Sequence, residues 1–447
     1  MCTFKNYFLV TNSLGYFMAQ NFDEFGEHLL ITILKKLYDN LNENLISEYH
    51  KKFNTANLIK DIDTTIFENT LQEYNFVNNI NCITLFDILK SFIEYIKNDN
   101  YNKYQNTILI TLVCYFSDMN NPIRQLVMRN VTPSFFNNIN TKNNKEWLKL
   151  IFNKIYEMFN YSKDLRPDSL SIIAKLFNNY MSIEDNVEPL YDLRYENRLF
   201  EIIQIGLTET DSLSRKFSVY LLKRIVDYSE NHNENPNLEW PVLFNFNKDI
   251  AKECSSCWTN FFLLYDMVQE TYVHLVDPIL PKFLDIIPTG KNESYELDIS
   301  WILIILKRGF QNDAIAVRKR FVRFLIDIDD PDRLRILGSQ FNFFFDSFLN
   351  VLDTASFYSV PGLGSFISPF GEALYLFIKR IVESFIDESN RTYFLCELMK
   401  KLPRLGFSIP IIFMMQGLAN VKGDCYCWGS EELAAMRNII EFHKNFQ

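Results

Sequence analysis

The sequence predicts an all-α protein, an α-solenoid of HEAT- or armadillo-like helix pairs, and three observations support that prediction. Apolar residues recur at helical spacing along almost the whole chain. Only 13 of the 447 residues are glycine, under half the roughly 7% of average chains, which favours long helices over the glycine-rich loops of cofactor-binding α/β folds. No alternating strand pattern bounded by turn dipeptides stands out.

The helical spacing predicts individual elements in order along the chain. After Asp211 or Ser212, either of which can cap a helix, one stripe is formed by Leu213, Phe217, Tyr220, Leu221, Ile225 and Tyr228. A second helix begins at Asn312 or Asp313, with a stripe formed by Val317, Phe321, Phe324, Leu325 and Ile328, and it ends before Pro331. Other helices are predicted at 24–39, 82–98, 104–117, 121–137, 144–160, 166–181, 195–208, 247–269, 298–309, 366–386, 388–401, 407–420 and 430–445.

The helices are predicted to form one continuous array. With weaker segments included, about nineteen helices give a helix pair roughly every 40 to 47 residues, the period of HEAT and armadillo repeats. Strict self-similarity is not visible. Segments 229–239, 289–296 and 356–365 fit either loops of one array or linkers between domains, and similar helices on both sides favour loops. The prediction is N-terminal repeats over 1–240 and C-terminal repeats over 241–447.

The composition indicates a protein of a reducing, aqueous compartment. Hydrophobic residues make up 48% and charged residues 22%, and the eight cysteines are scattered through helical patterns. The N-terminus lacks a signal-peptide pattern, and the apolar runs 301–306 and 409–415 are too short to cross a bilayer. We therefore expect a protein of the cytoplasm, or also of the nucleus, that does not bind membranes.

The sequence offers no convincing catalytic or metal site. Cys254 and Cys257 have CxxC spacing, and Cys425, Cys427 and His443 could complete a metal shell, but the pairs are too far apart along the chain for a zinc knuckle. Packing or surface thiols are the favoured interpretation, and no metal is predicted. The histidines are dispersed, and Asp329, Asp330 and Asp332 fit a solvated turn better than an acid–base pair.

Local groups of cations interrupt an acidic chain. The net charge of −10 and the pI near 5.2 argue against a surface that binds nucleic acid everywhere, but they allow a basic stripe. Such a stripe can follow a phosphate backbone, or it can be ordinary solvated helix surface. The candidate RNA-binding residues are Arg215, Lys216, Lys223, Lys307, Arg308, Arg318, Lys319, Arg320 and Arg323, with Arg224 beside the first group.

Several segments resemble the helical-repeat region of the TAR RNA-binding protein 1-like family, SpoU-class tRNA guanosine 2′-O-ribose methyltransferases. The resemblance covers roughly residues 205–447. It is carried by Ser214–Arg224, Trp258 with Phe261–Tyr265, His274–Pro281, Trp301, Asn312–Leu325, Pro410–Leu418 and Trp428–Ile440.

The resemblance implies a role in methylating a guanosine of the tRNA D-loop. In that family a knotted C-terminal domain binds S-adenosylmethionine and performs catalysis, and its glycine-rich segments have no counterpart here. We therefore expect no methyltransferase domain, no catalytic residue and no cofactor in this chain, and S-adenosylmethionine only if a further C-terminal domain exists. The helices would bind tRNA or scaffold a methyltransferase domain or protein partner. The alternative is a generic HEAT-type scaffold for protein partners, and an enzyme acting alone is a more distant third.

Overall fold

The computed structural model describes most of the chain, and every regular element in the described residues is helical. The described residues are 2–22, 26–41, 81–97, 104–116, 121–138, 145–181, 193–231, 251–269, 273–289, 296–360, 368–385, 387–402, 408–421 and 434. The predicted all-α class is thus confirmed. None of the described helices is long and apolar enough to span a bilayer.

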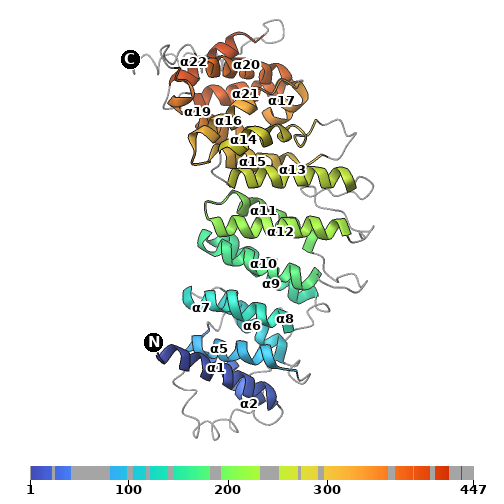
Figure 1. The fold of residues 1–447 in the computed structure, drawn as a ribbon, viewed down its shortest axis with the longest axis vertical. Coiled ribbons are helices and arrows are strands. Elements are labelled where there is room, and N and C mark those ends of the chain that lie inside the picture. Colours follow the sequence, from blue (N-terminus) through green and yellow to red (C-terminus); the bar gives the residue numbers. More distant parts are fainter. Residues whose placement is uncertain are drawn as a thin grey trace. The chain divides into compact units, whose positions relative to one another are not determined.

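The contacts divide the chain into two compact units, unit 1 (Met1–Tyr228) and unit 2 (Ser229–Gln447). The helices of unit 1, drawn in blue to green in Figure 1, are α1 (Cys2–Gln20), α2 (Glu27–Asp39), α5 (Cys82–Tyr95), α6 (Gln105–Tyr115), α7 (Asn121–Leu126), the π-helix η4 (Val127–Val131), α8 (Thr132–Asn138), α9 (Lys145–Tyr161), η6 (Lys163–Leu165), α10 (Arg166–Met181), η7 (Leu193–Tyr195), α11 (Asn197–Thr208) and α12 (Ser212–Asn231), whose last residues pass the division.

The helices of unit 2 are drawn in yellow to red in Figure 1. They are α13 (Ala251–Gln269), α14 (Val273–Ile279), η10 (Leu280–Phe283), α15 (Ile299–Phe310), α16 (Ile315–Ile326), α17 (Pro331–Gly338), α18 (Phe341–Phe343), the π-helix η11 (Phe344–Phe348), α19 (Leu349–Leu352), η12 (Ala355–Phe357), α20 (Pro369–Ser384), α21 (Glu388–Lys401) and α22 (Ser408–Ala419).

Most predicted helices match described ones closely. The predictions at 82–98, 144–160, 166–181 and 407–420 correspond to α5, α9, α10 and α22. The sequence pattern does not predict helices α1, α14 and α17, and the prediction at 430–445 lies outside the described residues apart from Ala434. Polar side chains fix several starts: Asn81 accepts from the Thr84 amide at 2.9 Å, and Asp298 accepts from the Ser300 amide at 2.9 Å.

Within each unit, several helices pack against their neighbour in the chain and against the helix two places along. In unit 1, α9 contacts α10 and α11, while α10 contacts α8 and α11. In unit 2, α13 contacts α14 and α15, while α16 contacts α14 and α15. The interior of unit 2 is aromatic: Trp258 and Trp301 are fully buried, with ring centroids 5.4 Å apart.

The segment predicted as one helix at 121–137 contains a π-helical turn. Pro133 has no amide hydrogen to donate to the carbonyl four residues earlier, which belongs to Arg129. The amide of Thr132 instead reaches back five residues to the carbonyl of Val127. The carbonyl of Arg129 accepts from the Nζ atom of Lys175 at 3.2 Å. A lysine from α10 thus supplies the hydrogen bond that the proline cannot donate.

Candidate nucleic-acid interface

Helix α12 carries the first group of predicted RNA-binding cations, and its start is fixed by Asp211, one of the two predicted capping residues. The Ser214 amide donates to Oδ2 of Asp211 at 2.7 Å. Partial burial acts to raise the pKa of Asp211, but hydrogen bonds from Ser214 and Leu213 and the charge of Arg215 outweigh it and hold that pKa below its usual value. A charged cap at this position also suits the positive end of the helix dipole.

The buried face of α12 differs from the predicted apolar stripe. Leu221 and Ile225 are buried as expected, but Leu213 and Tyr220 are 48% and 44% exposed. The buried face instead includes three serines, Ser214, Ser218 and Ser229. A β-carbon on Gly206 of α11 would collide with the hydroxyl of Ser218, so small residues on both helices permit a close approach. The predicted stripe was wrong at Leu213 and Tyr220, which are exposed, while small serines occupy core positions.

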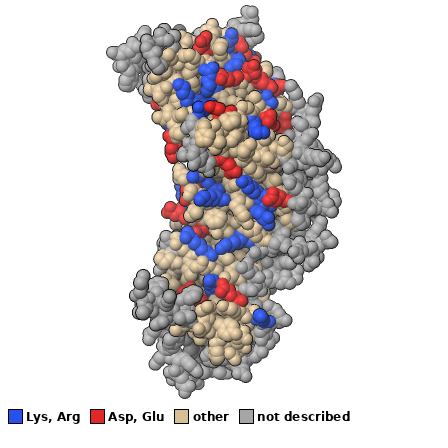
Figure 2. All heavy atoms as spheres, in the orientation of Figure 1, with Lys and Arg blue, Asp and Glu red and all other residues tan. Residues whose placement is uncertain are grey.

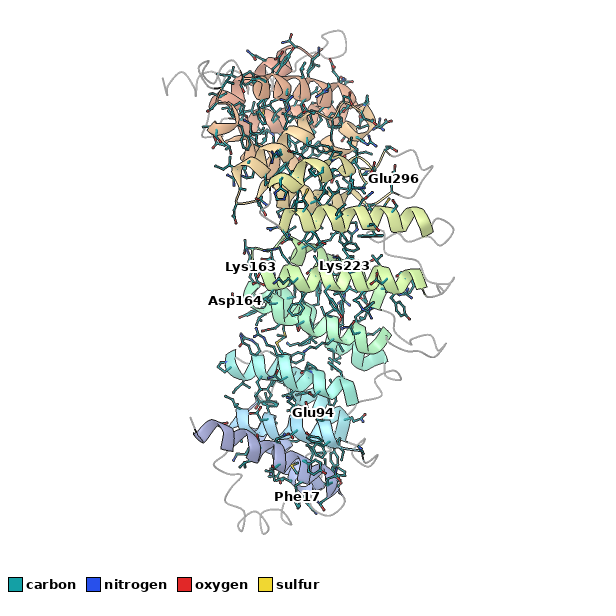
Figure 3. The ribbon with its side chains drawn as sticks, in the orientation of Figure 1. Phe17, Glu94, Lys163, Asp164, Lys223 and Glu296 are labelled. Carbon is teal, nitrogen blue, oxygen red and sulfur yellow. The ribbon has the colours of Figure 1, made fainter. Side chains whose placement is uncertain are left out.

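The exposed face of α12 combines cations with an aromatic ring. Lys216 lies one turn before Tyr220, while Lys223 and Arg224 lie one turn after it. Figure 2 shows Lys and Arg atoms gathered over the part of unit 1 that contains α10 and α12, and Lys223 is labelled on α12 in Figure 3. The helix as a whole has four cations, Arg215, Lys216, Lys223 and Arg224, against the two acids Asp227 and Glu230.

Asn178 of α10 ties this face to the preceding helix pair. Its Nδ2 atom donates to the Tyr220 hydroxyl at 2.8 Å, and its Oδ1 atom accepts from Nε of Arg224 at 3.3 Å. Sequence reasoning did not single out Asn178. The signal that could have found it is the separation of 42 to 46 residues between these partners, one helix pair along the chain.

Arg215 and Arg318 have the same structural task in their respective helix pairs. Nη1 of Arg215 donates to the carbonyls of Glu209 and Thr210, just beyond the end of α11. Nη1 of Arg318 donates to the carbonyls of Asn312 and Asp313, just beyond the end of α15. Each guanidinium therefore binds two carbonyls that follow the preceding helix and caps the end of that helix in this way.

We expect Arg318→Met to lower the free energy of unfolding by about 1.5–3 kcal/mol, because two carbonyls lose a charged donor. Arg215→Met should have a similar effect through α11. Urea denaturation followed by circular dichroism measures both. Lys319→Met, the adjacent substitution, is the matched control and should leave the midpoint almost unchanged. Equal midpoints for Arg318→Met and the parent would contradict the capping role.

The other cations of the α16 group are engaged with acids, a carbonyl or a ring. Arg320 pairs with Asp277 of α14 at 2.9 Å. Arg323 pairs with Asp327 at 2.7 Å and donates to the carbonyl of Pro369 at 3.0 Å. Nζ of Lys319 lies 5.9 Å from the ring centroid of Phe370.

The last turn of α15 holds two further predicted cations, Lys307 and Arg308, where positive charge suits the helix dipole. Basic and acidic atoms alternate over the visible face of unit 2 in Figure 2. The described part of unit 2 therefore offers a surface of mixed charge.

The remaining sequence candidates do not assemble into a described site. Cys257 is half-buried on α13, whereas the side chain of Cys254 and all of Cys425, Cys427 and His443 lie outside the described residues. Among the side chains that are described, no three of His, Cys, Asp or Glu are grouped to hold a metal ion. Asp330 caps α17 by accepting from the Asp332 amide at 2.9 Å, which is a structural role.

Comparison with known proteins gives a match centred on this region. Residues 163–295, which include α10 to α14, match the TARBP1 domain family. The chain is 26% identical over 263 residues to the mouse (Mus musculus) tRNA (guanosine(18)-2′-O)-methyltransferase TARBP1, a match that covers 56% of this chain and 16% of the mouse protein. No solved structure matches the chain significantly. The predicted resemblance to the TARBP1-like family is therefore confirmed, through a helical region that contains the exposed basic face of α12.

Proposed function

We propose that these helices form a non-catalytic region that binds tRNA, or scaffolds a catalytic domain on it, in tRNA ribose methylation. The observation that carries the proposal is the coincidence of two features. The stretch that matches the TARBP1 domain, 163–295, includes the basic face with Lys216, Lys223 and Arg224. The related mouse protein is named as a tRNA methyltransferase. Clustered cations on a chain with a net charge of −10 suit a phosphate backbone.

We also propose that the helix pairs form a HEAT- or armadillo-like array. Contacts between alternate helices, such as α9 with α11 and α13 with α15, support stacked pairs within each unit. Hydrogen bonds support the same period. Tyr156 donates to Glu201, 45 residues away, and Asn312 donates to the carbonyl of Val268, 44 residues away. These separations equal one helix pair of such arrays.

The proposed role is binding and positioning, carried out in the cytoplasm or also in the nucleus. Chemistry and the binding of S-adenosylmethionine would belong to a methyltransferase domain or partner. The alternative function is a HEAT-type scaffold for protein partners. The ion pairs of Arg320 with Asp277 and Arg323 with Asp327 favour it for unit 2, because those charges are already neutralised.

The test is a direct titration of labelled tRNA with the purified chain at several salt concentrations. We expect saturable binding whose log–log dependence on salt has a slope of about −0.7 to −0.9 for each phosphate contacted. With the three cations of the α12 face engaged, the slope should be about −2 to −3 or steeper. The overall negative charge works against unspecific attraction, so binding requires a localised surface. Absence of binding at about 50 mM salt would favour the protein-scaffold alternative.

A further inference from the structure

We propose that the exposed face of α12 binds an unpaired RNA nucleotide, with the ring of Tyr220 stacked on the base and the adjacent cations on neighbouring phosphates. The inference rests on the proposed tRNA-binding function and names the part of the RNA that this face would recognise. The first observation behind it is the exposure of Tyr220. The side chain is 44% exposed, although core positions of the same helix hold smaller residues.

Tyr220 is held in place although its ring is exposed. Its hydroxyl accepts the hydrogen bond from Nδ2 of Asn178 at 2.8 Å, and the same amide accepts from Arg224. Asn178, on the preceding helix pair, therefore holds the ring and the guanidinium in place before any ligand binds. A pre-organised aromatic platform loses little conformational entropy when a base stacks on it.

The cations have the spacing that a single strand crossing this face would require. Lys216 and Arg224 are eight residues apart, so their Cα atoms are separated by about 12 Å along the helix axis, with Tyr220 midway. A base on the ring would then have its flanking phosphates near a cation on either side. Proteins that bind single strands combine positive grooves with aromatic platforms in this way.

Duplex RNA fits this face less well. Bases inside an A-form helix are stacked on one another, and the narrow major groove excludes side chains, so a tyrosine ring reaches bases only in loops, bulges and ends. The amide of Asn178, a group able to read base edges, is occupied by Tyr220 and Arg224. We therefore expect recognition of an unpaired nucleotide with little preference among the four bases.

The corresponding position of α16 offers a contrast within the same chain. Taking Arg318 as the counterpart of Arg215, Arg323 occupies the place of Tyr220 and Asp327 the place of Arg224. There the two side chains pair with each other at 2.7 Å. An exposed ring with cations one turn away on both sides distinguishes the α12 face from its counterpart.

The experiment compares Tyr220→Ala, Tyr220→Phe and the parent chain for binding to tRNA, to a single-stranded RNA oligonucleotide and to a blunt RNA duplex of equal charge. We expect Tyr220→Ala to weaken binding of tRNA and of the oligonucleotide by about 5- to 100-fold, because base–aromatic stacking is removed. The salt slope should not change, since no cation is removed. Tyr220→Phe keeps the ring and should bind within a few-fold of the parent.

The outcomes separate this inference from the proposed function. If the parent binds tRNA and Tyr220→Ala binds it equally well, stacking on Tyr220 is wrong while tRNA binding stands. If the parent binds the single strand in a Tyr220-dependent manner but not tRNA, the stacking surface stands and the tRNA function is wrong. Equal losses on the blunt duplex and on single strands would overturn recognition of an unpaired nucleotide. Thermal melting confirms that the exposed substitution leaves the fold intact.

Discussion

Replacing Gly309 with valine should lower the free energy of unfolding of unit 2 by about 3 kcal/mol or more. A β-carbon at this position would lie closer than 3.0 Å to three ring carbons of Phe321, which is itself fully buried. Neither α15 nor α16 can move away without disturbing the packed interior. Alanine normally stabilises a helix relative to glycine by about 0.5–1 kcal/mol. We nevertheless expect Gly309→Ala to lower the free energy of unfolding, because its β-carbon would collide with the ring of Phe321. Urea denaturation followed by circular dichroism measures both variants.

A second substitution tests whether the destabilisation comes from this close approach. Phe321→Ala should destabilise the Gly309→Val background less than it destabilises the parent chain, because the new methyl groups occupy space that the ring vacated. In unit 1, Gly206→Ala should be rescued by Ser218→Ala, since the nearest obstructing atom is the serine hydroxyl. Additive effects in the Gly309 and Phe321 double variant would show that the two residues are not coupled.

The helices themselves were largely predictable, because apolar residues at helical spacing are a local property of the sequence. The face that a helix buries was less predictable. Periodicity assigned Leu213 and Tyr220 of α12 to the core, whereas the core uses Ser214 and Ser218. Serine is polar, but it is small, and at position 218 it permits the close approach of Gly206. Which residues a helix buries depends on the helix packed against it, and the apolar pattern of one helix carries no information about that neighbour.

The internal similarity between helix pairs also escaped prediction. Gly206, Arg215 and Lys216 recur as Gly309, Arg318 and Lys319, at one constant offset along the chain. The glycine and the arginine recur because each makes an equivalent contact, a close approach between paired helices and a cap on the first helix. Most other positions need only be apolar or polar, so the repeat is obscured in a search for strict self-similarity.

The candidate site was predictable in its charges and not in its geometry. Lys216 and Lys223 were identified because a run of cations is visible in the sequence. Asn178 was not, because its importance comes from Tyr220 and Arg224, which lie 42 and 46 residues further on. The sequence also grouped Arg318 with the RNA-binding candidates, although its guanidinium caps α15. Charge alone does not separate a capping arginine from one that can meet a ligand.

Reversing the charge of Lys216, Lys223 and Arg224 together should weaken tRNA binding by about a thousandfold. A charge-assisted hydrogen bond to a phosphate contributes about 1.5 kcal/mol, and affinity changes tenfold for every ~1.4 kcal/mol. The log–log salt slope should become shallower by about 2 to 3, because three phosphate partners are removed. The weakening should be similar for different tRNA sequences, since phosphates carry no sequence information. Anisotropy titrations over a salt series measure both quantities.

The matched control is the charge reversal of Lys319, Arg320 and Arg323 on α16, which changes the net charge equally. If the α12 face is the principal RNA surface, the control should weaken binding much less, because Lys319, Arg320 and Arg323 lie on another helix. Arg318 is kept in both variants so that the cap on α15 stays intact. Equal weakening by the two triple variants would mean that net charge, and not the α12 face, governs binding. A larger effect of the α16 variant would show that the RNA-binding surface lies in unit 2. Arg320 and Arg323 would then have to leave their acidic partners before they bind phosphate.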